Sequence, residues 1–233
     1  MVITLSRQIE SGGEEIGRMV AERAELRVLD RAILEHIAER EGMPASHLEI
    51  FDETVPGLIQ RLIVEWSSSV SHVSYVRRLI HVLVQLERQG QCLIVGRGGA
   101  FALADPGTLH VRVIAPMPNR VESAARRHAI PLADAERLIR RSDEEQARFI
   151  RAAFGADIGD PAHYDLTLNT SELTLEECAE IILGAARAKA RRRQVAAEAP
   201  EDLPSQLSRS QHQTQFPRVR AVVWRRYQRG LRG

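Results

Sequence analysis

Short apolar segments alternate with longer helical stretches along most of the chain, and this alternation limits the possible folds more than any other feature. Five segments have the composition of buried strands, at 2–6, 27–29, 92–95, 108–115 and 164–169. Helical stretches lie between or after them, at 13–24, 70–88, from 119, at 132–154 and at 174–190. Strands separated by helices form a parallel sheet covered on both faces. We therefore predict an α/β fold, with a five-stranded parallel sheet in a three-layer α/β/α arrangement.

The charges divide the chain into an acidic body and a basic tail. Residues 1–186 carry a net charge of −8, whereas residues 187–233 carry +9 and include Trp224 and Tyr227. A linker rich in Glu, Pro and Ser follows the last predicted helix, as is typical of a disordered segment. We predict one folded domain at 1–190 and a basic tail at 191–233, which suits contact with nucleic acid or an anionic surface.

Two observations bear on the cellular compartment. The apolar start of the chain lacks a basic region before it and indicates a first strand rather than a signal peptide, and no run of about eighteen apolar residues predicts a membrane span. The cysteines, Cys92 and Cys178, are 86 residues apart and have no metal or disulfide spacing. The expected location is the cytoplasm.

The loop after the first strand, residues 6–16, is a candidate phosphate-binding loop. A strand, the pair Gly12-Gly13 and a helix start follow one another, and such a turn can present backbone N–H groups to a phosphate. The usual lysine and Ser/Thr after the glycines are missing, and the only lysine of the chain is Lys189. Glu14 and Glu15 suit the helix dipole but repel a polyphosphate, so an ordinary turn stays an alternative.

Other polar residues follow the later strands, each with a structural alternative. Arg97 lies between glycines at a strand end, where an arginine reaches a cleft or is simply exposed. Arg141 and Arg148 share one helix face, with Asp143 able to hold one of them, or else this face is only solvated. Three further positions can either bind ligand or end a strand and cap a helix: Asp30, Asn169 and Thr170.

Three blocks of this sequence resemble the cytidylate kinase-like family of P-loop proteins. The first runs from Val2 through Ser11-Gly12-Gly13 to Leu29-Asp30-Arg31, the second is Ile94 to Gly98, and the third is Tyr164 to Ser171 with the following Leu175-Glu176-Glu177. The resemblance covers roughly residues 1–187. Relative to true cytidylate kinases, Gly13 replaces the loop lysine, Glu15 the magnesium-binding Ser/Thr, and Gly98 an Asp.

The resemblance implies a P-loop kinase fold with a helical insert and a lid, and a kinase that uses ATP and Mg²⁺. The residues expected to bind ATP are Arg7, Ser11, Gly12, Gly13, Glu14, Glu15, Ile16, Asn169 and Thr170, with Glu15 also the expected metal ligand. The residues expected to act on the transferred group are Arg97, Arg141, Asp143 and Arg148. The residues expected to bind the acceptor are Asp30, Arg97 and Arg120.

Two functions therefore stand side by side at this stage. One is a nucleoside monophosphate kinase, with CMP as the acceptor by resemblance and with arginines supplying the charge of the missing lysine. The other is a non-catalytic nucleotide- or phosphate-binding regulator on the same fold, which the absent lysine and the Glu14-Glu15 pair favour. A third possibility is a role centred on the basic tail.

Overall fold

The computed structural model describes residues 1–29 and 69–198, and it contains one five-stranded parallel sheet. The strand order is β2 (Arg27–Leu29), β3 (Cys92–Val95), β1 (Val2–Arg7), β4 (Thr108–Ile114) and β5 (Leu166–Asn169). Every neighbouring pair is parallel. The predicted α/β class and the five parallel strands are confirmed. Asp30 and most of the predicted helical insert lie outside the described residues.

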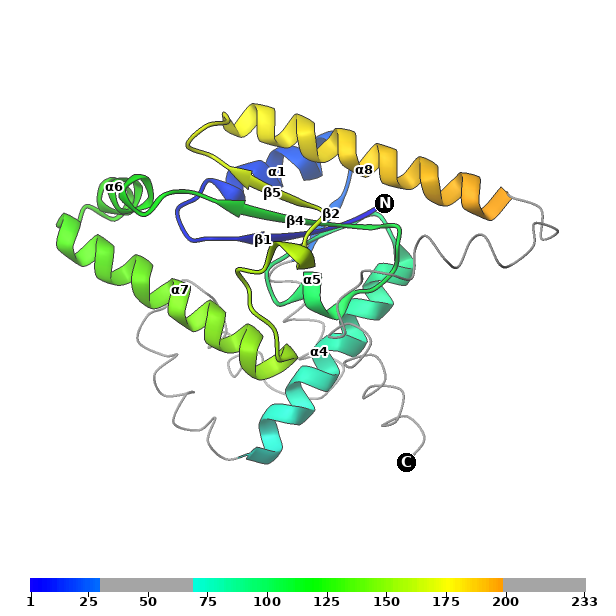
Figure 1. Cartoon of the computed structure of the whole chain (residues 1–233), viewed down its shortest axis with the longest axis horizontal. Coiled ribbons are helices and arrows are strands. Elements are labelled where there is room, and N and C mark those ends of the chain that lie inside the picture. Colours follow the sequence, from blue (N-terminus) through cyan, green and yellow to red (C-terminus); the bar gives the residue numbers. More distant parts are fainter. Residues whose placement is uncertain (30–68, 199–233) are drawn as a thin grey trace.

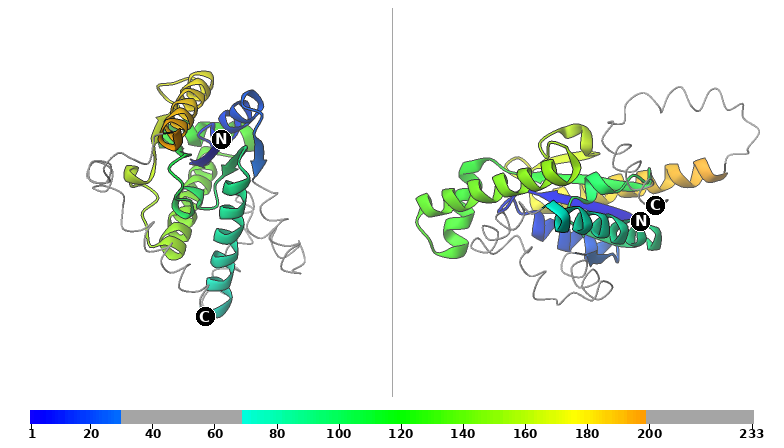
Figure 2. Two further views of the ribbon diagram at one scale, coloured as in Figure 1. Left: turned by 90° about the vertical axis from the view of Figure 1, so that its right-hand side faces the viewer. Right: turned by 90° about the horizontal axis from the view of Figure 1, so that it is seen from below.

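Helices cover both faces of this sheet (Figures 1 and 2). One face carries α1 (Gly13–Arg23) and α8 (Leu175–Glu198), which pack against each other. The other face carries α4 (Ser69–Gln89), the short α5 (Gly99–Ala102) and α7 (Leu132–Phe154). The helix α6 (Met117–His128) follows β4 and packs on α7, and a 3₁₀ turn, η3 (Pro161–His163), precedes β5.

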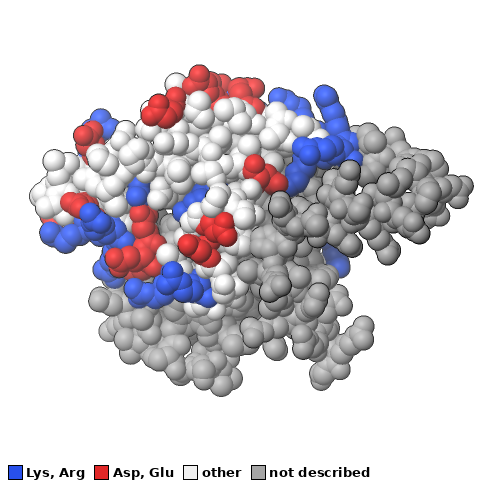
Figure 3. All heavy atoms as spheres, in the orientation of Figure 1, with Lys and Arg blue, Asp and Glu red and all other residues white. Residues whose placement is uncertain are grey.

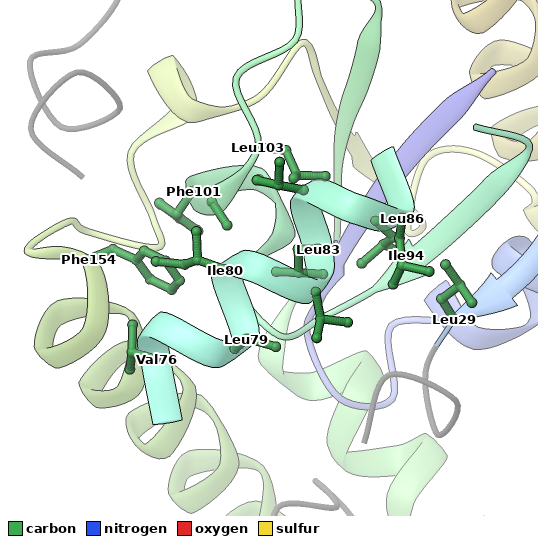
Figure 4. Close-up of a cluster of buried hydrophobic side chains, with 14 of the residues drawn as sticks. Leu29, Val76, Leu79, Ile80, Leu83, Leu86, Ile94, Phe101, Leu103 and Phe154 are labelled. Carbon is green, nitrogen blue, oxygen red and sulfur yellow. The ribbon is translucent and has the colours of Figure 1, made fainter. Parts of the chain in front are cut away.

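The alternation of side chains along the strands divides the core between the two faces. On the α1 and α8 side, Ile3 and Leu5 of β1 join Val111 and Val113 of β4 in a cluster that is almost inaccessible to solvent. On the other side, α4 contributes a row of apolar residues that packs against Phe101 of α5 and other residues (Figure 4). The sheet is thus anchored from both faces.

Polar side chains occupy part of this second face, which distinguishes it from the first. Thr4 of β1 is hydrogen-bonded to His110 of β4, with 2.7 Å between Oγ1 and Nδ1. One step further along the same strands, Ser6 lies beside Arg112. Thr4, His110 and Arg112 are all buried. A buried polar group is costly unless it is hydrogen-bonded, so this column is a specific feature of the fold and not a surface effect.

Side chains complete the part of β4 that β5 leaves uncovered. The strand β5 pairs with β4 only from Val111 onward. Before that point, the Asp165 backbone N–H donates to the His110 carbonyl at 2.7 Å, and the His110 N–H donates to Asp165 Oδ2 at 2.7 Å. Lys189 of α8 donates to the Thr108 carbonyl at 2.7 Å and to Asp165 Oδ2 at 2.6 Å.

The helix α8 extends to Glu198, beyond the predicted end of the folded region at residue 190. Two acidic side chains, Glu176 and Glu177, lie in its first turn. Negative charge there favours the helix because it faces the positive end of the helix dipole. The remaining tail, 199–233, lies outside the described residues. Within the described part of the chain, no helix is both long and apolar enough to cross a membrane.

The Asp165–Lys189 pair should make stability depend on pH. Partial burial raises the pKa of Asp165, but the hydrogen bonds from Lys189 and from the His110 backbone lower it more, so the net pKa lies below the ordinary value. A depressed carboxyl pKa stabilises the fold above the unfolded-state pKa, and this contribution is lost as the pH falls through the folded-state pKa. We expect Lys189→Met to be less stable than wild type at pH 7 in urea unfolding, with a gap that narrows below about pH 5.

The exposed pair of Arg18 and Glu22, at 2.8 Å on α1, provides the control. Arg18→Met should change the free energy of unfolding by no more than about 0.5 kcal/mol. If the difference in free energy of unfolding between Lys189→Met and wild type stays constant from pH 7 to acid pH, the Asp165–Lys189 pair is not the source of the pH dependence.

Candidate functional site

Three loops follow strands β1, β3 and β5 at one edge of the sheet, the carboxyl edge. They are residues 8–12 after β1, 96–98 after β3 and 170–174 after β5. The Gly96 backbone N–H donates to the Leu5 carbonyl at 2.9 Å, which places the second loop directly beside β1. Ligands of open parallel sheets bind at this edge, so we assign the candidate site here.

The loop after β1 is held from several directions. The Gln8 N–H donates to the Val113 carbonyl at 3.0 Å, and the Gln8 side chain accepts from the Ala115 N–H at 3.1 Å. Ser11 is buried and donates its hydroxyl to the Gln8 carbonyl at 2.7 Å. Thr170, from the loop after β5, donates to the Ser11 carbonyl at 2.9 Å. The predicted ATP-binding residues Ser11 and Thr170 are therefore brought together.

Gly12 and Gly13 make the turn from this loop into α1. Gly12 has a φ of +75° and is the N-cap, and no side chain caps the helix there. A Cβ on Gly12 would come within 2.5 Å of Leu175 Cδ2, and one on Gly13 within 2.7 Å of Arg7 Cβ. Glycine is needed at both positions because the loop packs closely against α8 and against the end of β1.

A buried carboxylate, Glu10, occupies this loop. Glu10 has a φ of +59°, which is unusual for a residue other than glycine, and its side chain is only 5% exposed. Ser123 of α6 donates to Glu10 Oε2 at 2.8 Å, and Arg127 of α6 lies 3.4 Å from Oε1. His128 Nε2 is 3.5 Å from the same carboxylate. The carboxylate of Glu10 therefore connects the loop to α6.

Arg127 also contacts the two acidic residues in the first turn of α1. Its guanidinium lies 3.8 Å from Glu14 and 3.3 Å from Glu15. The negative charge of Glu10 raises the pKa of Arg127 by more than partial burial lowers it, so this side chain stays cationic. Three carboxylates thus surround one arginine at the positive end of α1. The predicted ATP-binding residues Glu14 and Glu15 lie at the loop, but they oppose the positive potential that a phosphate needs.

Glu15 was also the expected magnesium ligand, and the surroundings do not fit that role. Its carboxylate is engaged with Arg127. Within residues 1–29 and 69–198, no group of three His, Cys, Asp or Glu side chains could hold a metal ion. We therefore derive no step through a magnesium ion held by these residues.

Arg97 lies in the loop beside β1, as predicted. Its φ is +53°, and both neighbouring glycines, Gly96 and Gly98, also have positive φ. A Cβ on Gly98 would overlap the ring of Phe154, at the end of α7. Arg97 is half-buried and forms no hydrogen bond or ion pair with the described part of the chain. An unengaged guanidinium at this edge is available for an anion.

The structure corrects the prediction for Asp143 and Arg120. Asp143 holds neither Arg141 nor Arg148; its two oxygens accept from Arg120 Nη1 at 2.9 Å and Nη2 at 2.8 Å. Arg120 Nε donates to the Ala115 carbonyl at 3.1 Å, and the residue is 3% exposed. This pair joins α6 to α7 and leaves little of Arg120 for a substrate, since all three nitrogens are engaged.

The other two predicted arginines of α7 differ from each other. Arg141 donates to Glu145, one helical turn away, at 2.9 Å, which is an ordinary pair along a helix. Arg148 is exposed and, within 1–29 and 69–198, has no side-chain partner. Acidic and basic side chains lie side by side over α6 and α7 in Figure 3. Of the predicted lid residues, only Arg148 is uncommitted.

The end of β5 borders the phosphate loop. Asn169 accepts from the Ser171 N–H at 3.1 Å and so closes the turn after the strand. Thr174 then caps α8, with reciprocal bonds to and from Glu177 at 2.8 and 3.2 Å. The cap of α8 is therefore Thr174 rather than Thr170, which instead contacts the phosphate loop.

Lys189 cannot replace the missing loop lysine, because it binds Thr108 at the opposite edge of the sheet. The positive side chains at the carboxyl edge are consequently all arginines.

Comparison with known proteins assigns the family. The profile of the cytidylate kinase-like family matches residues 2–172. This chain belongs to the cytidylate kinase-like family. A cytidylate kinase from Sulfurisphaera tokodaii is 25% identical over 187 residues, 78% of this chain and 93% of that protein. One from Methanopyrus kandleri is 29% identical over 106 residues, 42% of this chain. An uncharacterized protein from Eubacterium ventriosum has a similar fold, with a TM-score of 0.61 and 14% identity, over 80% of this chain and 98% of that one.

Some matches cover only part of the other protein. The chain spans 55% of the Methanopyrus kandleri kinase, and 18% of a uronate isomerase from Corynebacterium glutamicum, with 29% identity over 92 residues.

Three residues of this cytidylate kinase-like chain were missed as site residues from the sequence. Glu10 was not singled out because only the folded loop shows its burial. Arg112 and Tyr164 lie beside Ser6 of β1, with Arg112 Nη1 3.1 Å from Ser6 Oγ and 3.3 Å from the Tyr164 hydroxyl. A signal for Arg112 was present, since it is a charged residue within an otherwise buried strand.

Gly98 and Gly155 allow the packing of the Arg97 loop to be tested. Both have positive φ, +71° and +65°, but a Cβ on Gly155 would meet nothing within 4 Å. Gly155→Ala should cost about 1–2 kcal/mol for the left-handed backbone alone. Gly98→Ala should cost roughly 1–3 kcal/mol more, because the methyl group overlaps Phe154.

Urea unfolding of the two variants measures this difference directly. Equal losses of stability would mean that Phe154 does not pack on the Arg97 loop.

Proposed function

We propose that this protein is a nucleoside monophosphate kinase that transfers the γ-phosphoryl group of ATP to a nucleotide, with CMP the first candidate. The observation that carries the proposal is the convergence of the Gly12-Gly13 turn, the Arg97 loop and the loop after β5 at one edge of the sheet, in a member of the cytidylate kinase-like family. The coarser statement, a kinase-type family, follows from that membership. The acceptor and the cytoplasmic location belong to the proposal.

In this proposal the backbone N–H groups at the start of α1 bind the ATP phosphates, since no side chain caps that helix end. Asn169 and Thr170 border the nucleotide from the loop after β5. Arg97 and Arg148, which are not engaged elsewhere in the described residues, supply positive charge. An oxygen of the acceptor phosphate forms a bond to the γ-phosphorus while the bond to the bridging oxygen breaks, and ADP leaves with that electron pair. Positioning and charge stabilisation account for most of such catalysis.

A second function is supported by the carboxylates at the loop. Glu10, Glu14 and Glu15 gather around Arg127 at the end of α1 where phosphate would bind. This arrangement favours a regulator that binds a nucleotide or phosphate weakly and performs no transfer. The same site serves in both cases, so the two functions differ in turnover and not in location.

A coupled ADP-release assay with ATP, Mg²⁺ and each nucleoside monophosphate tests the kinase. We expect turnover, fastest with CMP. Arg97→Gln should lower kcat by roughly 10²–10³-fold, because a donor to the developing charge is lost. Arg18→Gln, on the exposed face of α1, should retain wild-type activity. Absence of turnover with every monophosphate, alongside measurable ATP binding, would overturn the kinase in favour of the regulator.

Glu15→Gln separates the two functions further. In a regulator, removal of a negative charge from the loop should strengthen ATP binding in calorimetry by up to about fivefold. In a working kinase whose Glu15 serves the reaction, the same change should lower turnover. Glu22→Gln on the same helix is the matched control, since Glu22 pairs only with Arg18 among the described residues.

A further inference from the structure

Arg112 is a buried arginine that the proposed ATP site does not use. It lies in β4, on the face covered by α4, α5 and α7, and it is 8% exposed. Its neighbours along the strand, Val111 and Val113, point to the opposite face. Burial of a guanidinium is costly unless an anion compensates the charge.

Among the described residues, Arg112 contacts only neutral groups. Nη1 lies 3.1 Å from Ser6 Oγ and 3.3 Å from the Tyr164 hydroxyl, and the guanidinium carbon is 5.5 Å from the centre of the Tyr164 ring. Burial raises the pKa of Tyr164, whose hydroxyl donates to the Ile158 carbonyl at 3.0 Å. Within residues 1–29 and 69–198, no carboxylate pairs with Arg112, and its Nε and Nη2 form no hydrogen bond.

Arg120 shows how the same fold treats a structural arginine. It is buried to a similar degree, but both oxygens of Asp143 and the Ala115 carbonyl engage all three of its nitrogens. Arg112 has no such compensation from residues 1–29 and 69–198. The contrast with Arg120 indicates that Arg112 is available to an anion that the described residues do not supply.

The position of Arg112 joins it to the candidate site. Arg112 pairs in register with Ser6, one residue before the end of β1 and six before Gly12. On the other side of β1, Gly96 bonds to Leu5, so Arg97 follows immediately. Arg112, on β4, and Arg97, in the loop after β3, therefore lie on the two sides of β1, near the edge where the phosphate loop begins.

We propose that Arg112 binds the phosphate of the acceptor nucleotide, a phosphomonoester, through its unengaged Nε and Nη2. This inference rests on the proposed function and deepens it, since it names the group that anchors the acceptor. Nε and Nη2 form the planar pair of donors that suits two oxygens of one phosphate. Tyr164 and Ser6 hold the guanidinium in place, as positioning residues. Neutralising the acceptor also lowers its repulsion from the phosphates of ATP.

The test uses the full chain with Arg112→Met, an apolar replacement of similar length. We expect the unliganded melting temperature to be unchanged or higher, because an uncompensated buried charge has been removed. The Kd for CMP should rise roughly 10- to 100-fold in calorimetry, as for the loss of charge-assisted hydrogen bonds. Binding of ATP and of cytidine, which lacks the phosphate, should stay within about twofold of wild type, as for Arg18→Met.

Arg112→Lys keeps the charge without the planar pair of donors and decides the matter if Arg112→Met does not fold. It should weaken CMP binding by about tenfold. The proposal would be overturned if Arg112→Lys binds CMP as tightly as wild type and Arg112→Met does too. It would also be overturned if Arg112→Lys binds CMP as tightly as wild type and Arg112→Met does not fold. Equal binding of acetate and inorganic phosphate to wild type would overturn the phosphate assignment.

Failure of the proposed kinase function can be distinguished from failure of the Arg112 inference. If wild type shows no turnover, but inorganic phosphate binds and Arg112→Met abolishes that binding, the anion site stands and the kinase falls. If turnover with CMP is present and its KM is unchanged in both Arg112 variants, the kinase stands and this inference falls.

Discussion

The hydrogen bonding of β1 on both of its edges is the constraint on which the site depends. β1 pairs with β3 from Val2 to Leu5 and with β4 from Val2 to Arg7, so the strand is paired on both edges up to Leu5 and on one edge to its end. Because the strands are parallel, their following loops meet at one edge. The phosphate loop, the Arg97 loop and the buried Arg112 owe their proximity to this register, and a slip by one residue would reverse which side chains face the polar half of the core.

Electrostatics at this edge is divided between two elements. The start of α1 is surrounded by Glu10, Glu14 and Glu15, which Arg127 only partly neutralises. On the two sides of β1, Arg97 of the loop after β3 and Arg112 of β4 have no carboxylate partner among the described residues. Positive charge thus lies on the side of β3 and β4 rather than at the loop where a P-loop kinase carries its lysine. The fold and the family are established. The chemistry at this edge depends on how an incoming phosphate changes the balance between these carboxylates and arginines.

The sheet and most helix bounds could be predicted from the sequence, because periodicity and helix-boundary residues act locally. The helix at 132–154 is found where expected, as are the strands at 27–29 and 92–95. Partners of side chains could not be predicted in the same way. Asp143 is close to Arg141 in sequence but binds Arg120, which is 23 residues distant, because α6 and α7 pack face to face. The alternation Thr108, His110, Arg112 within an apolar strand was the one readable sign of a polar face, yet its meaning required the neighbouring strand.

The hydrogen bonds of Asp165 and Lys189 to β4 affect whether a strand of another molecule can pair with this sheet. An uncovered strand edge offers free N–H and C=O groups to any extended chain, and this is a common route to aggregation. Here the first half of β4 has those groups occupied by Asp165 and Lys189. A strand from another molecule would have to displace a charged pair before it could add to the sheet. The single lysine of the chain therefore occupies a backbone carbonyl that another strand would need for pairing.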